Sequence, residues 1–122
     1  MCVYSLTMLV DISKGELIDK ITILEIKMER ITNEERIVNV KHELEVLRKL
    51  EFETEHKAQL KKINEIIWDV EERLRQLEEI QSFGEEFIEK ARMVYKFNDK
   101  RAEVKKNINL ETGSDIIEEK SY

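Results

Sequence analysis

The spacing of apolar residues predicts helices over most of the chain. From residue 17 onwards, apolar side chains recur at steps of three and four, which places them on one face of a helix. Three such stripes are present: Leu17, Ile21, Leu24, Met28 and Ile31; Ile37, Val40, Leu44 and Leu47; and Leu60, Ile63, Ile67, Val70, Leu74 and Leu77. The third stripe keeps a heptad spacing that is typical of coiled coils.

Capping residues indicate where these helices begin. Ser13, Thr32 and Ser82 each stand three residues before a glutamate, the capping-box arrangement in which two side chains satisfy free backbone N–H groups. The third box predicts a fourth helix from about Glu85 to about Asn109. A turn is then expected over residues 112–114 and a short last helix over residues 115–120.

One boundary stays open in this pattern. The three- and four-residue spacing of apolar residues loses its phase over residues 51–57. Residues 33–82 therefore form either one helix with a stutter or two helices with a break near residues 52–55.

The expected fold class is all-α, an antiparallel bundle of three to four long helices in a single domain of residues 1–122. Residues 3–10 are apolar and predict a short extended N-terminal segment. Ile18, Ile23 and Ile26 lie around the first helix, away from its stripe, and a helix that is apolar on most sides has to be buried on most sides. In so small a chain a second subunit buries it most easily. We therefore predict a homo-oligomer that forms through the first helix and the N-terminal segment.

Composition narrows the class of protein. Charged residues make up 39% of the chain, there is no proline, and the net charge is −6, which fits long solvated helices and disfavours nucleic acid as a partner. A single cysteine, Cys2, indicates a reducing compartment. The sequence lacks a signal-peptide pattern and any apolar run long enough to span a membrane. We therefore expect a cytoplasmic protein that does not insert into membranes.

The most informative candidate site is a polar row in the fourth helix. The stripe begins with Phe87, Ala91 and Val94 and continues at the same spacing with Asn98, Arg101, Lys105 and Asn109. Buried polar side chains destabilise a fold unless they have partners. Three interpretations of this row stay open: ion pairs with acids of other helices, such as Asp19 or Asp69; a helix end that protrudes into solvent; or a binding site for an anionic ligand formed by Asn98, Arg101, Lys105 and Asn109.

Other patterns carry little chemistry. The carboxylate pairs Glu16 with Asp19, Asp69 with Glu72, and Glu86 with Glu89 do not match the order of the magnesium-binding helical pyrophosphatases. His42 and His56 make no zinc motif and are expected on exposed helix faces. We predict neither a metal nor a cofactor. Trp68, which lies off its helix's stripe, is expected to pack against another helix.

Two segments carry a resemblance to a known family. The runs GELIDKITILEIKMERI at 15–31 and KFNDKRAEVKKNIN followed by GSDIIEEKSY at 96–122 resemble a family of small uncharacterised helical domains from bacteria and phages. This resemblance implies the fold and the compartment, but no catalytic residue. The chain is also similar to the small helical chorismate mutases. That similarity implies a dicarboxylate site with Lys27, Arg30 and Lys41, although the family's leucine–arginine pair is missing.

The function predicted from these patterns is a non-catalytic binding or assembly module. The alternative is a protein or enzyme that binds a small anionic metabolite or nucleotide through the polar row of the fourth helix. The sequence assigns no enzyme class.

Overall fold

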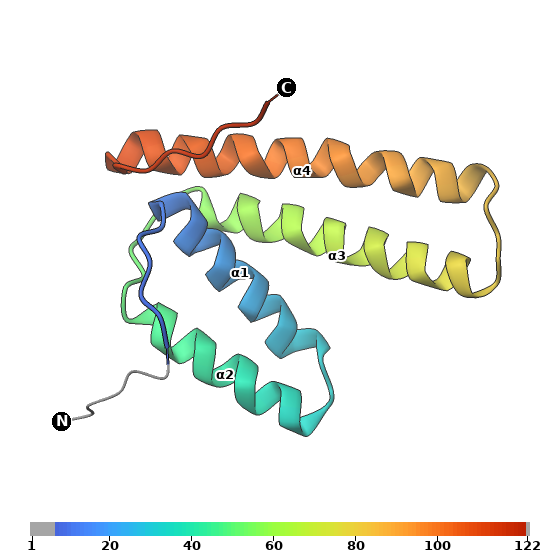
Figure 1. Ribbon diagram of the computed structural model, residues 1–122, viewed down its shortest axis with the longest axis horizontal. Helices are drawn as coiled ribbons and strands as arrows, with labels where there is room; N and C mark the ends of the chain where they lie inside the picture. The colour runs from blue at the N-terminus through green and yellow to red at the C-terminus, as the bar shows by residue number, and fades with distance from the viewer. Residues whose placement is uncertain (1–6, 122) are drawn as a thin grey trace.

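The computed structural model describes residues 7–121 and contains four helices in that range, with no strand. They are α1 (Lys14–Arg30), α2 (Glu34–Arg48), α3 (Lys57–Glu79) and α4 (Glu85–Thr112) (Figure 1). The predicted all-α fold is confirmed. Residues 49–56 separate α2 from α3, so the second alternative for residues 33–82, two helices with a break, is correct.

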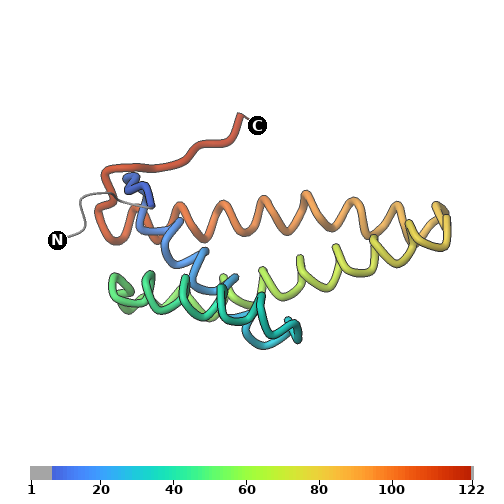
Figure 2. The backbone as a smooth tube through the Cα atoms, turned by 60° about the horizontal axis from the view of Figure 1, so that its bottom comes forward, coloured from blue at the N-terminus to red at the C-terminus, as the bar shows by residue number. Residues whose placement is uncertain are grey.

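The four helices form two antiparallel hairpins, α1–α2 and α3–α4, which contact each other through α1. The helices α3 and α4 form the longer hairpin, and α1 packs against both of them at one end (Figures 1 and 2). Within the described residues α2 contacts no helix other than α1. The far half of the α3–α4 hairpin therefore extends beyond the shorter α1–α2 pair.

The apolar stripes meet in two clusters on either side of α1. One cluster joins α1 to α3 and α4 and consists of Ile18, Leu60, Ile63, Ile67, Val104 and Ile108. The other joins α1 to α2 and consists of Leu17, Ile21, Leu24 and Leu44. Each of these side chains contributes roughly 1.5–3 kcal/mol when fully buried. Phe52, in the α2–α3 connection, packs against both clusters.

The apolar faces of α1 are covered within a single chain. Ile18 and Ile26 are at most 1% exposed and Ile23 is half-buried, because three helices of the same chain surround α1. Burial of α1 therefore needs no second subunit. The homo-oligomer stays a prediction that now rests on the N-terminal segment, where Met8 and Leu9 are 90% and 97% exposed.

The helix ends agree with the capping predictions in one case of three. Ser13 caps α1 by accepting a hydrogen bond from the backbone N–H of Glu16. The N-cap of α2 is Asn33 instead of Thr32. Gly84 occupies the N-cap of α4 and has no side chain to bond the helix, so the capping box predicted at Ser82 is wrong.

The chain after α4 differs from the prediction. Gly113 ends α4 with a φ of 66°, a left-handed conformation that glycine adopts without steric strain. The short helix predicted over residues 115–120 does not form. We call residues 114–121 the tail; it turns back along α4 (Figures 1 and 2). Of the predicted N-terminal extended segment, residues 3–6 lie outside the described residues and residues 7–10 form no strand.

No helix among the described residues is long and apolar enough to cross a membrane.

Candidate functional site

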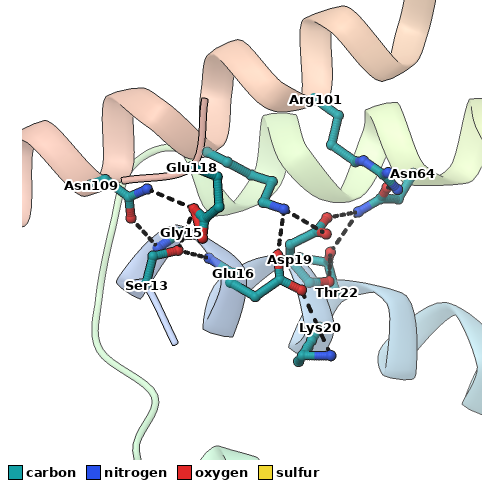
Figure 3. Close-up of polar contacts among 11 residues, drawn as sticks. Ser13, Gly15, Glu16, Asp19, Lys20, Thr22, Asn64, Arg101, Asn109 and Glu118 are labelled. Carbon is teal, nitrogen blue, oxygen red and sulfur yellow. Dashed lines mark hydrogen bonds and ion pairs between the residues drawn. The ribbon is translucent and has the colours of Figure 1, made fainter. Parts of the chain in front are cut away.

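A polar network fills the seam where α1 meets α3, α4 and the tail (Figure 3). Its position depends on Gly15, in the first turn of α1. A Cβ atom at this residue would lie 2.4 Å from the backbone oxygen of Lys105, so only glycine lets α1 approach α4 this closely. The close approach brings polar side chains of three helices and the tail within hydrogen-bonding distance.

The most buried charge in the seam is the carboxylate of Asp19, a residue that is 4% exposed. Asn64 of α3 donates a hydrogen bond to Asp19 Oδ1 at 2.8 Å and another to Thr22 Oγ1 at 2.9 Å. The Nζ atom of Lys105 lies 3.6 Å from Asp19 Oδ2. Every buried side-chain nitrogen or oxygen among the described residues has a hydrogen-bond partner, so this network meets the condition under which polar burial is tolerated.

Lys105 is held by acids of α1. Its ammonium group lies 2.5 Å from Glu16 Oε2 in addition to its approach to Asp19. Lys105 therefore forms the ion pair with Asp19 that was one of the interpretations of the polar row. Asp69, the other acid considered, pairs with Arg30 instead.

Asn109 is also a structural residue. It is 1% exposed. Its Oδ1 accepts a hydrogen bond from the backbone N–H of Gly15 at 2.6 Å, and its Nδ2 donates one to Glu118 Oε1 at 3.2 Å. Asn109 thus connects the first turn of α1 to the tail, and its role in ligand binding stays a prediction.

Arg101 and Asn98 behave differently from Lys105 and Asn109. Within the described residues Arg101 makes one side-chain hydrogen bond, a long one of 3.5 Å to Asn64 Oδ1, although a guanidinium group has five N–H donors. The half-buried Asn98 amide has no hydrogen-bond partner among residues 7–121. The predicted polar row therefore divides into two structural residues and two residues with unused hydrogen-bonding capacity.

These two residues open onto a groove between α4 and the tail. The groove has a volume of about 350 Å³ and is lined by Asn98, Arg101, Ala102, Lys105, Lys106, Glu118, Glu119 and Lys120. It does not include Asn109, so the structure gathers three of the four predicted site residues around one hollow.

The tail contributes the acidic wall of the groove. Glu118 Oε1 accepts hydrogen bonds from Ser13 Oγ at 2.7 Å and from Asn109. Burial alone would raise the pKa of the Glu118 carboxyl group, but these hydrogen bonds and the charge of Lys105 lower the pKa below its ordinary value. Glu118 is therefore a firmly held carboxylate. The sequence analysis missed it because the tail was expected to be helical.

A second charged cluster, also missed by the sequence analysis, lies between α1, α2 and the start of α3. The Glu25 side chain is 13% exposed and lies 2.9 Å from both Arg48 Nη2 and Lys57 Nζ. Burial raises the pKa of Glu25, but the hydrogen bonds from Lys57 and Arg48 outweigh burial and lower it. These residues come from three separate segments, so no local spacing could have indicated the cluster.

The other candidate groups have partners within the chain. Arg73 pairs with Glu86 through two hydrogen bonds of 2.8 Å. His42 is exposed as predicted, whereas His56 is half-buried and its Nε2 lies 2.8 Å from Glu111 Oε2. Possible metal-ligand atoms of Glu55, His56 and Glu111 lie within 4.8 Å of one another, but the His–Glu hydrogen bond accounts for this arrangement. The absence of a metal stays a prediction.

The residues implied by the similarity to chorismate mutases do not share one hollow. Arg30 pairs with Asp69 and lies beside Trp68 and Arg75. Lys41 lines a different hollow with Glu25 and Lys61.

The fold and the seam define this molecule as a small all-α protein in which two helical hairpins enclose a polar seam with a groove beside it. Residues 8–122 match the model of DUF6165, a family of unknown function, and the chain belongs to that family. The match includes the middle of the chain as well as the two ends that carried the resemblance. No curated protein and no solved structure matches the chain.

Proposed function

We propose that this protein is a non-catalytic binding module that holds the anionic group of a small molecule beside Arg101. The main support is the hydrogen bonding of Arg101, a residue that lines the groove and whose guanidinium group makes one long hydrogen bond within the described chain, to Asn64. Arginine recognises carboxylate and phosphate groups through paired N–H donors in a fixed plane. A half-buried guanidinium with unused donors is suited to that role.

The surroundings of Arg101 support the same proposal. Asn98, which offers an amide without a partner, lines the groove on the same helix. Lys105 and Lys106 also line the groove, where their charges are paired with those of Glu16 and Glu119. The groove volume of about 350 Å³ lies at the lower end of the roughly 300–1,000 Å³ range of small-molecule sites. A phosphate, a pyrophosphate or a short dicarboxylate fits that size.

Binding is proposed in preference to catalysis because the other ionisable groups of the groove are already engaged. Glu118 accepts two hydrogen bonds, Glu119 pairs with Lys106, and Lys105 pairs with Glu16. A general base or nucleophile needs a reactive lone pair that is not committed to a neighbour. The groove thus offers recognition of a negative charge, and Arg101 is the cation with unused donors that would hold the ligand.

Thermal unfolding with added anions tests this proposal. We expect phosphate, pyrophosphate, succinate or ADP to raise the unfolding midpoint of the wild type, because a ligand at 100 times its Kd adds about 2.7 kcal/mol to folding stability. Arg101→Ala should lose the shift. Arg92→Ala removes an exposed arginine of the same helix outside the groove and should keep it. Equal shifts in both variants would mean that Arg101 is not the binding residue.

A further inference from the structure

The tail lies along the basic side of α4 and is attached there at three points. Glu118 accepts hydrogen bonds from Ser13 and Asn109. Glu119 Oε1 lies 2.7 Å from Lys106 Nζ, and Lys120 Nζ lies 2.6 Å from Asp99 Oδ1. The tail thus places a second carboxylate, that of Glu119, on the wall of the groove that contains Arg101.

The three attachments differ in strength. Glu118 is itself exposed, but its partners Ser13 and Asn109 are 0% and 1% exposed, so this attachment is partly buried and is the firmest of the three. The side chains of Lys106 and Glu119 are 43% and 65% exposed, and those of Lys120 and Asp99 are 31% and 45% exposed; exposed ion pairs of this kind contribute little. The tail is therefore held more firmly at Glu118 than at Glu119, whose ion pair is the most exposed of the three attachments.

We propose that Glu119 is a built-in competitor for the groove and that the end of the tail is displaced when an anion binds. This inference rests on the proposed function and adds a form of regulation to it. The Glu119 carboxylate neutralises Lys106 at the groove wall. An incoming anion that contacts Arg101 gains Lys106 as a second cation only when Glu119 leaves it. The ligand is then an anion that replaces the Glu119 carboxylate beside Lys106 and that has at least two negatively charged oxygens.

The size of the effect follows from the exposure of the pair. Breaking an exposed ion pair changes an equilibrium by about 1.5- to 5-fold. Glu119→Gln should therefore strengthen anion binding by about that factor. Glu103→Gln, which removes the same charge from an exposed site of α4 on another groove, controls for the change in net charge and should leave the affinity as in the wild type.

The experiment is isothermal titration of pyrophosphate into the full chain, with wild type, Glu119→Gln, Glu103→Gln and Arg101→Ala compared at one salt concentration. If Glu119→Gln binds pyrophosphate more tightly than the wild type, Glu103→Gln binds it as the wild type does and Arg101→Ala does not bind it, Glu119 is a competitor for the groove. Equal affinity of wild type and Glu119→Gln overturns the competitor while the proposed function stands. Absence of binding in every variant, Glu119→Gln included, overturns both.

A second measurement separates displacement from simple charge repulsion. Backbone ¹⁵N relaxation of the wild type should show residues 119–121 gaining fast motion when pyrophosphate saturates the groove, while Glu118 keeps its order. A tail that stays ordered throughout at saturation would contradict displacement, even if Glu119→Gln bound more tightly.

Discussion

At the scale of single residues, Lys105 and Arg101 occupy the same face of α4 but have different partners. Lys105 balances Glu16 and the buried Asp19, whereas Arg101 has one long hydrogen bond to Asn64. The two residues should therefore make different contributions to the free energy of unfolding.

Substitution of each residue tests this difference. Lys105→Ala should lower the free energy of unfolding by about 1–3 kcal/mol, because it leaves the Asp19 carboxylate buried without its cation. Arg101→Ala should lower it by less than about 1 kcal/mol, because little hydrogen bonding is lost. Urea denaturation at neutral pH measures both values. Similar large losses would mean that Arg101 belongs to the scaffold and would weaken its role as a ligand-binding residue.

The polar row could be predicted from the spacing of Asn98, Arg101, Lys105 and Asn109, but its division could not. Whether each residue is structural depends on what α1 and the tail place against it. Asn109 is hydrogen-bonded to Gly15, which lies 94 positions earlier in the sequence, and to Glu118, which lies 9 positions later. Periodicity within one helix carries no information about such partners.

At the scale of secondary-structure elements, the start of α1 sets the geometry of the seam. The backbone of Gly15 is close to that of Lys105, and the amide of Asn109 fills the remaining space. The helix α1 can therefore approach α4 only if residue 15 has no side chain.

Gly15→Ala tests this close approach. The added Cβ would meet a backbone oxygen, which cannot rotate away, so we expect a loss of about 1–3 kcal/mol in the free energy of unfolding, as in other overpacked sites. Gly84→Ala is the control, because nothing lies within 4 Å of a Cβ there; it should cost less than about 1 kcal/mol, the range of N-cap preferences. Equal midpoints for Gly15→Ala and wild type would mean that the seam is wider than described.

The elements themselves were largely predictable because their apolar stripes become the core. Leu60, Ile63, Ile67 and Val70 of the heptad stretch are all buried. The caps were less predictable, since Asn33 competes with Thr32 for one helix start and Gly84 replaces Ser82 at another. The tail was predicted wrongly because its charged residues bind α4 and Ser13 in place of forming a helical turn.

At the scale of the whole molecule, ion pairs connect the two hairpins around α1. Glu25 of α1 contacts Arg48 at the end of α2 and Lys57 at the start of α3. Because the pKa of Glu25 is lowered in the folded state, its contribution to stability is present above the ordinary carboxyl value of 4.5 and is lost as the pH falls through the lower, folded-state pKa.

Glu25→Gln should therefore destabilise the protein at neutral pH, and the difference from wild type should shrink as the pH falls below about 4.5. Urea denaturation from pH 7 to pH 3 follows this difference. Glu43→Gln, an exposed position of α2 without an ion-pair partner among the described residues, should track the wild type over the whole range. A difference for Glu25→Gln that is independent of pH would contradict the role of its charge.

The proposed function requires that Arg101 binds an anion in the groove between α4 and the tail. The most direct measurement is a ¹H–¹⁵N spectrum of the arginine side chains during titration with pyrophosphate. If Arg101 binds pyrophosphate, its Nε–H signal should shift and saturate, be absent from Arg101→Ala, and move far more than the signal of the exposed Arg92. An Arg101 signal that does not move, or that moves only as much as the signal of Arg92, would mean that Arg101 does not bind the anion.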